Sequence, residues 1–310
     1  MKTVVTGGAG FIGSHLVNRL VSQSYEVHVI DNLTTGDPGR LHSEAVLHVT
    51  DVGSDQAATY IRLLKPDIVF HLAAQTDVQQ SIKSPTADAY ANIKGTINVL
   101  EACRAAKVRK IIFASSSEVY GNVAKDVLTE DDPVSPISFY SLSKLAAEQY
   151  IRLYKHFYGL EYTILRYSHV YGPRQTTNGE GGVIAVFGEQ MSSGLPLSIF
   201  GDGTQTRDFI YVKDVVEANL AVIDLGHSDT LHVSTGQCTS VNRLVDIVRG
   251  QFTGDIHVNY LPAKPGDIAH SCLDNSKIMS MLNWKPEYTI EQGLMETTRY
   301  WSVSSNNDNV

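Results

Sequence analysis

Short apolar runs alternate with longer amphipathic stretches along the first half of the chain. Runs of strand length, rich in Val and Ile, lie at residues 3–6, 26–30, 68–72, 110–114 and 162–166. Apolar positions at helical spacing lie between them, over residues 11–23, 56–64, 87–106 and 141–158. Strands that are apolar throughout are typical of a parallel sheet with both faces covered. The repeated strand–helix units therefore predict an α/β fold with a doubly wound parallel sheet.

This alternation ends after about residue 166. Gly and Pro gather in residues 171–182 and 194–203, and shorter strand-like and helix-like runs follow. We therefore predict a sheet domain of residues 1–166 and a smaller mixed α/β lobe of residues 167–310, from which some segments return to the first domain. A chain of 310 residues is long for one compact core, which agrees with this division.

Composition excludes several classes of function. Lys and Arg total 25 and Asp and Glu total 33, so the formal net charge is −8, which argues against non-specific nucleic-acid binding. The eleven His are scattered and the three Cys lie far apart, so we expect neither a metal site nor a disulfide framework. No apolar run approaches the length of a membrane span, and the first residues lack a leader pattern. We expect a cytoplasmic enzyme that does not bind membranes.

A glycine pattern follows the first strand and opens the first helix. Gly7, Gly10 and Gly13 allow a tight turn, close approach of a pyrophosphate and close packing of helix on strand. A helix N-terminus offers N–H groups and a positive dipole end to phosphates. Asp31 ends the next strand, where an acid binds the adenosine ribose diol and repels a 2′-phosphate. The pattern predicts a Rossmann-type domain that binds NAD rather than NADP.

Tyr140 and Lys144 stand four residues apart and so share one face of a helix. The reference pKa of tyrosine is about 10, and a neighbouring ammonium favours the phenolate. Ser116 follows the strand at 110–114, at the carboxyl edge of the sheet where ligands of such folds bind. Together these side chains predict proton transfer to and from a substrate hydroxyl, with Tyr140 as the base.

The same motifs resemble the extended short-chain dehydrogenase/reductase superfamily. Within it, the chain is most similar to the NAD-dependent nucleotide-sugar epimerase/dehydratase family of the UDP-glucose 4-epimerase type, from residue 1 to about residue 300. The resemblance is carried by residues 6–13, Asp31-Asn32-Leu33, His71-Leu72-Ala73-Ala74, Ser116 with Tyr140 and Lys144, Leu165-Arg166-Tyr167, and Tyr171-Gly172-Pro173-Arg174.

The resemblance implies C4 epimerisation of a UDP-hexose or UDP-N-acetylhexosamine through a 4-keto intermediate, with an NAD that stays bound. Tyr140 would take the proton of the sugar 4-hydroxyl, Lys144 would bind the nicotinamide ribose, and Ser116 would polarise the 4-oxygen. The implied cofactor residues are Gly7, Gly10, Phe11, Ile12, Gly13, Asp31, Asn32, Asp51, Val52, Leu72, Ala73, Ala74, Tyr140 and Lys144.

The resemblance also implies that the second lobe binds the nucleotide sugar. The strand Ile199-Phe200-Gly201 would pair with the uracil ring, Arg207 would bind the diphosphate, and Asp267 would bind the nucleotide ribose. The other implied substrate residues are His169, Gly182, Val183, Lys264 and Ser271.

Three of these positions depart from the family pattern. His169 replaces the usual Asn: a neutral imidazole would still donate one hydrogen bond, whereas a protonated one would favour phosphate and make binding pH-sensitive. Lys264 replaces an Arg, which keeps the charge but loses the bidentate fork. Ser271 replaces a bulky Tyr and leaves room for a 2-acetamido group, so UDP-N-acetylhexosamines are admissible substrates.

Glu118 leaves a second reaction open. It lies two residues beyond Ser116, so in an extended strand end both side chains would point the same way. A carboxylate there could take the C5 proton of a 4-keto sugar and drive loss of an oxygen from C6. Nucleotide-sugar 4,6- and 5,6-dehydratases and UDP-glucuronate decarboxylases resemble the chain here, although Ser117 replaces the Asp that many 4,6-dehydratases carry. The alternatives are therefore a UDP-sugar dehydratase, a decarboxylase and a non-catalytic NAD-binding regulator.

The resemblance finally implies a homodimer. Relatives pack the helices that correspond to residues 87–106 and 141–158 into an intersubunit four-helix bundle. An ordinary core explains most of the apolar side chains on these helices equally well, namely Tyr90, Ile97, Leu100, Leu145, Tyr150 and Leu153.

Overall fold

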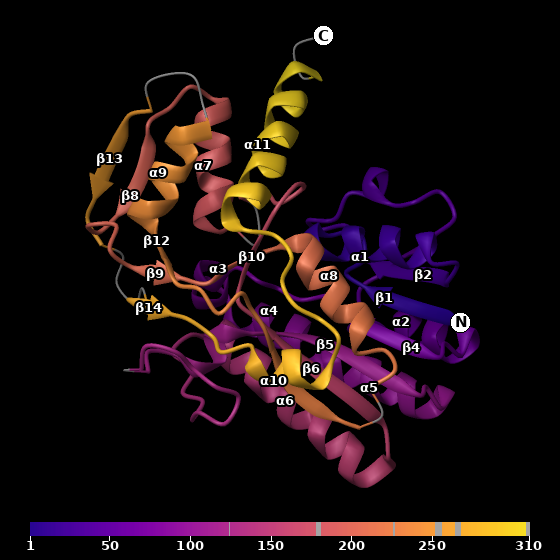
Figure 1. Ribbon diagram of the computed structural model, residues 1–310. Coiled ribbons are helices and arrows are strands. Elements are labelled where there is room, and N and C mark those ends of the chain that lie inside the picture. Colours follow the sequence, from indigo (N-terminus) through magenta and orange to yellow (C-terminus); the bar gives the residue numbers. More distant parts are fainter. Residues whose placement is uncertain (124, 178–180, 226, 252–255, 264–267, 308–310) are drawn as a thin grey trace.

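The computed structural model describes residues 1–123, 125–177, 181–225, 227–251, 256–263 and 268–307. Its centre is a seven-stranded parallel sheet, which confirms the predicted doubly wound α/β class (Figure 1). In spatial order the strands are β11 (Asp229–Val233), β6 (Glu161–Tyr167), β5 (Lys110–Ser116), β4 (Ile68–His71), β1 (Lys2–Thr6), β2 (Glu26–Asp31) and β3 (Val46–Val49).

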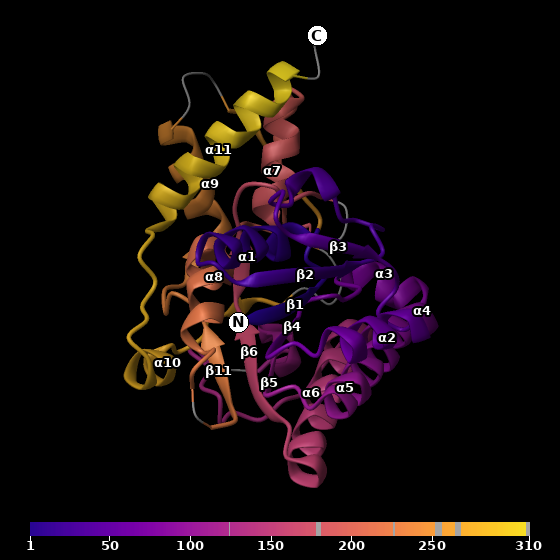
Figure 2. The same cartoon turned by 90° about the vertical axis from the view of Figure 1, so that its right-hand side faces the viewer.

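Helices cover both faces of this sheet (Figure 2). Helices α1 (Phe11–Ser22) and α8 (Val212–Ala221) pack on one face, and α2 (Asp55–Leu64), α5 (Gly95–Ala106) and α6 (Phe139–Tyr158) pack on the other. Successive strand residues point to opposite faces, so Val5 belongs to the core under α1 and Val4 to the core under α2. Both side chains are fully buried, which explains why these strands are apolar throughout.

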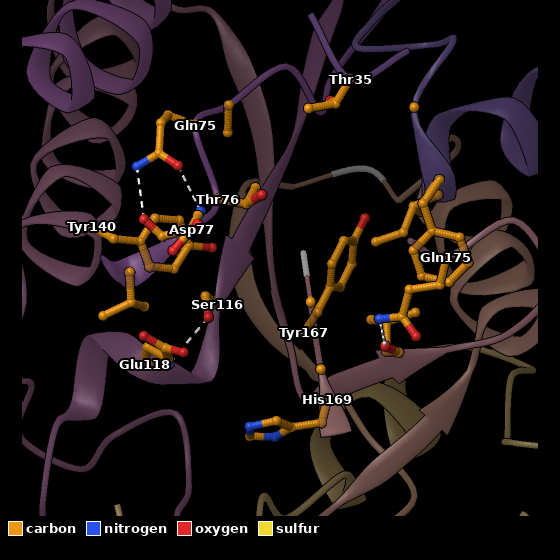
Figure 3. Close-up of a pocket in the computed structure, with 18 of the residues that line it drawn as sticks. Thr35, Gln75, Thr76, Asp77, Ser116, Glu118, Tyr140, Tyr167, His169 and Gln175 are labelled. Atoms are coloured by element: carbon orange, nitrogen blue, oxygen red, sulfur yellow. Dashed lines mark hydrogen bonds between the residues drawn. The ribbon is translucent and has the colours of Figure 1, made fainter. Parts of the chain in front are cut away.

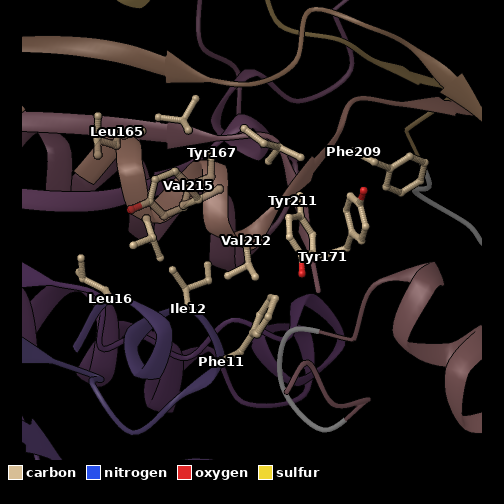
Figure 4. Close-up of a cluster of buried hydrophobic side chains, with 14 of the residues drawn as sticks. Phe11, Ile12, Leu16, Leu165, Tyr167, Tyr171, Phe209, Tyr211, Val212 and Val215 are labelled. Carbon is tan, nitrogen blue, oxygen red and sulfur yellow. The ribbon is translucent and has the colours of Figure 1, made fainter. Parts of the chain in front are cut away.

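Segments from the second half of the chain complete this first core. Strand β11 pairs with β6 from Asp229 opposite Thr163 to Val233 opposite Tyr167. On the α8 side, Val212 and Val215 lie in one buried cluster with residues of α1 and β6 (Figure 4). The two halves of the sequence therefore share a hydrophobic core rather than folding as separate bodies.

The other elements build a second lobe beyond the carboxyl ends of the strands (Figure 1). Its strands form three small sheets: β10 (Phe209–Tyr211) with β7 (His169–Tyr171), β13 (Val258–Leu261) with β8 (Leu197–Phe200), and β9 (Thr206–Arg207) between β12 (Thr239–Ser240) and β14 (His270–Ser271). Its helices are α7 (Val183–Ser192), α9 (Val241–Gln251) and α11 (Ile290–Asn307), whereas α10 (Ser276–Met281) packs back against β11.

Three details differ from the sequence pattern. The helix expected over 87–106 is helical but divided: α4 (Pro85–Ala89) runs into a π-helical turn, Tyr90–Lys94, before α5, and a short helix, α3 (Val78–Lys83), precedes it. The pattern also missed strands β3 and β11, which form the two edges of the sheet. A strand at the edge of a sheet has a neighbour on one side only, so it buries fewer side chains and its sequence is less apolar. In β3, the side chains of Val46 and Val49 are about half exposed.

One disulfide is present that the sequence did not indicate. Cys238 and Cys272 are joined by a disulfide, with Cα atoms 5.6 Å apart. A separation of 34 residues gives no local signal, and only the fold brings the two together. The remaining Cys103 is a buried free thiol. Across the described ranges, no helix has both the length and the apolarity to cross a membrane, and no cluster of three or more His, Cys, Asp or Glu is suited to a metal ion.

Candidate active site

A cavity of about 990 Å³ lies at the carboxyl ends of the central strands, between the sheet and the second lobe. This is the edge where open α/β sheets bind ligands, and the volume suits a large ligand. In Figure 3, Gln75, Ser116, Glu118 and Tyr140 stand on one side of it and His169 stands on the other.

The cavity brings together most of the residues that the sequence singled out. Those that line it are Gly7, Gly10, Phe11, Ile12, Gly13, Asp31, Asn32, Asp51, Val52, Leu72, Ala73, Ala74, Ser116, Glu118, Tyr140, Lys144, His169, Gly182, Val183, Ile199, Phe200 and Arg207. Two predicted residues do not line it: Gly201 follows β8, and Ser271 lies buried in β14 beside Arg207. Lys264 and Asp267 lie outside the described residues.

The turn after β1 requires glycine at two positions. Gly7 has a φ of +69°, and a Cβ there would lie 2.6 Å from the backbone N of Ala73. A Cβ on Gly13 would lie 2.1 Å from the carbonyl oxygen of Gly7. Gly10 occupies the N-cap position of α1 and has no side chain to accept from the first N–H groups of the helix. This arrangement fits the pyrophosphate of NAD, which needs close backbone approach at a helix N-terminus.

Asp31 is held at the end of β2 by backbone groups. Its Oδ2 accepts a hydrogen bond from the N–H of Ala9 at 2.9 Å, and its Oδ1 accepts from the N–H of Leu33 at 2.8 Å. Burial raises the pKa of Asp31, and these two bonds oppose the rise. A carboxylate has further lone pairs, so Asp31 can still accept from the two hydroxyls of a ribose at the cavity wall.

Tyr140 and Lys144 lie in the first two turns of α6. Ser138 and Ser141 form a capping box that fixes this helix start: each hydroxyl accepts from the backbone N–H of the other residue, at 3.0 and 3.1 Å. Both functional side chains are almost fully buried, and the Lys144 ammonium lies 4.3 Å from the centre of the Phe113 ring on β5. Helix α6 therefore delivers a phenol and an ammonium to the same cavity.

Ser116 is the last residue of β5 and meets Tyr140 and Lys144 at the cavity. Its hydroxyl accepts a hydrogen bond from the N–H of Glu118 at 3.2 Å (Figure 3). Residues Ser117–Tyr120 form a 3₁₀ turn, so the expected extended conformation beyond Ser116 is wrong. Ser116, Ser117 and Glu118 nevertheless all line the cavity, and Ser117 is the most buried of the three.

Glu148, about one turn beyond Lys144 on the same helix face, ties α6 to the central strands. The Ser115 hydroxyl donates to its Oε1 at 2.6 Å, and Arg166 of β6 donates twice, to Oε1 at 2.9 Å and to Oε2 at 2.7 Å. Burial works to raise the pKa of Glu148, but the bonds and charge of Arg166 outweigh it and hold this pKa below its usual range. The strand end before Ser116 and the helix that carries Tyr140 are thus locked to one carboxylate.

The network continues into the loop beyond Ser116. Arg166 Nη1 donates to the hydroxyl of Tyr120 at 2.7 Å, and that hydroxyl lies 2.5 Å from His232 Nε2. His232 Nδ1 lies 2.9 Å from the carbonyl of Asp274 and must donate there, so Nε2 accepts from Tyr120. Burial lowers the pKa of His232 to about 4, which keeps the ring neutral. Strand β11 therefore supports the turn Ser117–Tyr120 through Tyr120.

His169 and Arg207 face the cavity from the second lobe. The Nδ1 atom of His169 is buried and has no hydrogen-bond partner within the described structure. Burial, followed by the positive charge of Arg207, lowers the pKa of His169 to about 3. The ring is therefore neutral near pH 7, and an orphaned nitrogen beside a guanidinium fits an anionic ligand with hydrogen-bonding oxygens.

Comparison with known proteins identifies the family. The model of the NAD dependent epimerase/dehydratase family matches residues 3–233. The chain belongs to this family. A Methanocaldococcus jannaschii protein, whose name as a UDP-glucose 4-epimerase is provisional, is 41% identical over 98% of this chain and 99% of its own length.

Two solved structures of family members are similar over almost the whole chain. The UDP-glucose 4-epimerase of Thermotoga maritima, solved with UDP-glucose, matches with a TM-score of 0.94 and 38% identity, covering 98% of this chain and 99% of its own. The UDP-N-acetylglucosamine 4-epimerase of Methanobrevibacter ruminantium, solved with UDP-N-acetylmuramic acid, matches with a TM-score of 0.92 and 36% identity over 98% of each chain. The predicted resemblance to this family is confirmed.

Sequence reasoning missed residues that shape the site of this epimerase/dehydratase. Asn92, in the π-helical turn, accepts from the N–H of Gln75 at 2.8 Å and donates to the carbonyl of Gln75 at 2.9 Å and to the Ser143 hydroxyl at 3.0 Å. Gln75, Thr76 and Asp77 line the cavity beside Tyr140 (Figure 3). No pattern marks Asn92, because an added residue in one helical turn leaves the helical spacing nearly unchanged.

Proposed function

We propose that this protein is an NAD-dependent UDP-sugar 4-epimerase that works through a 4-keto intermediate. The observation that carries the proposal is the convergence of three sets of residues on one cavity: the glycine turn before α1, the catalytic group of Ser116, Tyr140 and Lys144, and Arg207 with His169 opposite. The relatives named above share this architecture and act on UDP-sugars by their names. NAD, when bound, would take hydride from the sugar C4 and return it.

The protein's own groups then have distinct tasks. The Tyr140 phenolate would remove the proton of the 4-hydroxyl and give it back after the keto sugar has turned over. The Lys144 ammonium, fixed against Phe113, would stabilise that phenolate and bind the nicotinamide ribose. Ser116 would donate a hydrogen bond to the 4-oxygen. Asp31 would bind the adenosine ribose diol.

The second lobe would bind the nucleotide. Arg207 is suited to the diphosphate because its guanidinium stays ionised and can donate two parallel hydrogen bonds. A neutral His169 would donate one hydrogen bond to the same group. We assign the uracil to Ile199, Phe200 and Gly201, and the nucleotide ribose to Asp267. Both UDP-glucose and UDP-N-acetylglucosamine are candidate substrates by the names of the relatives, while Ser271, expected to leave room for a 2-acetamido group, does not line the cavity.

We assign the two ligands to the two predicted domains. Residues 1–166 would hold NAD and residues 167–310 would hold the UDP-sugar, with α8 and β11 returning to the first core. We also propose a cytoplasmic homodimer. On α6, Leu142, Tyr150, Leu153 and Phe157 form an exposed apolar stripe at helical spacing, which fits a helix bundle between subunits. Sedimentation analysis showing a monomer at micromolar concentration would contradict the dimer.

Product analysis tests the proposed function. Purified protein is incubated with UDP-glucose or UDP-N-acetylglucosamine, and the products are measured by mass spectrometry and proton NMR in deuterated water. We expect the 4-epimer with unchanged mass and no net consumption of added NAD. The Tyr140→Phe variant is the matched inactive control. Absence of turnover on every UDP-sugar tested would contradict the proposal.

Glu118 supports one second candidate, a UDP-sugar dehydratase. Its half-buried carboxylate lines the cavity next to Ser116, close enough for its own N–H to bond the Ser116 hydroxyl. There it could take the C5 proton from a 4-keto sugar, with loss of water across C5 and C6. Deuterium at C5 together with a product lighter by one water would favour this candidate over the epimerase.

A further inference from the structure

Arg207 stands on one of the shortest strands of the molecule. Strand β9 has two residues and lies between two further strands of two residues, β12 and β14 (Figure 1). Arg207 is paired with Thr239 in antiparallel β12 and with Ser271 in parallel β14. Strands of this length exchange few backbone hydrogen bonds, so pairing alone holds Arg207 weakly.

The disulfide lies directly beside these pairs. Cys238 precedes Thr239 and Cys272 follows Ser271, so the register places both cysteines next to Asp208, the residue after Arg207. Strand β9 ends there. The disulfide therefore joins the two outer strands immediately beyond the residue that they hold between them.

Asp208 adds hydrogen bonds to the junction of β9, β12, β14 and the disulfide. Its buried carboxylate accepts hydrogen bonds from the N–H and hydroxyl of Thr235 and from the N–H of Gly236, at 2.8 to 2.9 Å. Its backbone N–H donates to the Ser271 carbonyl at 2.9 Å, and its own carbonyl accepts from the N–H of His169 at 2.9 Å. Residues 235–236 lead straight to Cys238. One junction thus sets the positions of Arg207, His169 and Ser271.

The two cysteines differ in access. Cys238 is exposed, whereas Cys272 is buried. A dithiol can therefore reach the bond from the Cys238 side and reduce it by exchange: the S–S bond breaks, two electrons and two protons give two thiols, and the dithiol becomes a disulfide. Cys103 is fully buried in the first core, and burial raises the pKa of its thiol, so it does not compete in this exchange.

We propose that the Cys238–Cys272 disulfide is a positioning element of the UDP-sugar site, which holds Arg207 for the diphosphate and loosens it when a dithiol reduces the bond. The catalytic groups are anchored elsewhere, through Glu148 and Arg166, so reduction changes substrate affinity and leaves the chemical step intact. The proposal rests on the UDP-sugar function proposed above.

Thiol titration first establishes the bond. Protein purified without reductant is denatured and titrated, and we expect one thiol per chain, from Cys103, rising to three after treatment with dithiothreitol. Three thiols without reductant would contradict the proposal.

Steady-state kinetics then test the positioning role. Reduction is expected to raise KM for UDP-glucose about tenfold, as for weakening one hydrogen bond to a charged group, with kcat unchanged. Removal of the dithiol and reoxidation should restore KM. The Cys238→Ser variant should match the reduced enzyme and ignore dithiothreitol, whereas Cys103→Ser should behave as wild type. Equal KM in the oxidised and reduced wild type, whatever the variants do, would overturn the proposal.

Calorimetry with UDP as the probe distinguishes failure of the positioning role from failure of the proposed UDP-sugar function. If the positioning role is right, UDP binds the oxidised protein more tightly than the reduced protein, while NAD binding stays the same. Equal UDP affinities in both states would overturn the positioning role and leave the proposed function standing. Absence of UDP binding in both states would overturn the proposed function itself, and the positioning role with it.

Discussion

The cavity has two walls that are built in different ways. The sheet wall carries Ser116, Tyr140 and Lys144, and the lobe wall carries His169 and Arg207. Ser116 ends a seven-residue strand that is paired along its length with β6 and, over four residues, with β4. The buried ion pair of Glu148 and Arg166 anchors this strand through Ser115. Arg207 stands on a two-residue strand closed by a disulfide and a buried Asp. In the proposed function, the sheet wall would carry the groups that react with the sugar, and the lobe wall would bind the nucleotide. Among the positions that depart from the family pattern, His169 and Ser271 lie on strands of the lobe, whereas Glu118 lies in the turn after β5 on the sheet side.

The largest effect should come from removing the anchor of the sheet wall. Glu148→Gln leaves the buried Arg166 without its counter-charge and should lower the free energy of unfolding by about 3–5 kcal/mol in urea titrations. Arg152→Ala is the matched control, because Arg152 is partly exposed and bonds the same carboxylate at 3.1 Å, so it should cost under about 1 kcal/mol. Equal losses for both variants would show that the buried pair has no special role.

The next largest effect should come from removing the Tyr140 hydroxyl, which should slow the chemical step and leave stability unchanged. Tyr140→Phe should lower kcat at least about a hundredfold, as for loss of a general base, with the unfolding free energy almost unchanged. Tyr154→Phe, on the same helix and bonded to Glu101 outside the cavity, should retain the wild-type kcat. Full activity of Tyr140→Phe would refute the role of Tyr140 as base.

On the lobe wall, loss of the Arg207 charge should raise KM for the UDP-sugar and leave kcat unchanged. Arg207→Ala should raise KM for the UDP-sugar by about tenfold or more, since a hydrogen bond to a charged group is worth roughly 1.5–3 kcal/mol. Arg207→Lys should fall between Ala and wild type, because the charge remains and the bidentate fork is lost. A kcat loss at unchanged KM would instead place Arg207 with the catalytic groups.

The smallest effect should be a pH dependence from His169. Its pKa is about 3 in the folded protein and about 6.5 when unfolded, so the unfolded state binds the extra proton and stability is lost as the pH falls below 6.5. At pH 5 this group alone should account for about 2 kcal/mol. His169→Asn should remove that part of the acid sensitivity in melting curves. An unchanged pH profile in the Asn variant would show that folding does not lower the pKa of His169.

The sheet wall could be predicted closely from the sequence. Gly7 and Gly13 belong to one short glycine pattern, Asp31 ends the next strand, and Tyr140 and Lys144 share a helix face by spacing alone. Ser116 follows from the rule that ligands meet the carboxyl ends of parallel strands. Local patterns suffice here because each of these residues lies in a regular strand or helix or in the turn that joins β1 to α1.

What could not be predicted depends on contacts between distant segments. The pairing of Cys238 with Cys272 needs the register of three two-residue strands, and the Glu148–Arg166 pair needs α6 laid across β6. The neutral state of His169 follows from burial, which the sequence does not report. Glu118 reaches the cavity through a 3₁₀ turn rather than the extended strand end that was expected.

The most direct test of the central claim follows the hydrogen at C4. UDP-glucose carrying deuterium at C4 is converted in ordinary water with unlabelled NAD added in excess, and the products are examined by NMR. Because the account has the same hydrogen removed and returned within one closed site, the 4-epimer should keep its deuterium at C4, with none found on the added NAD or in water. Loss of the label from C4 would contradict epimerisation through an enclosed 4-keto intermediate.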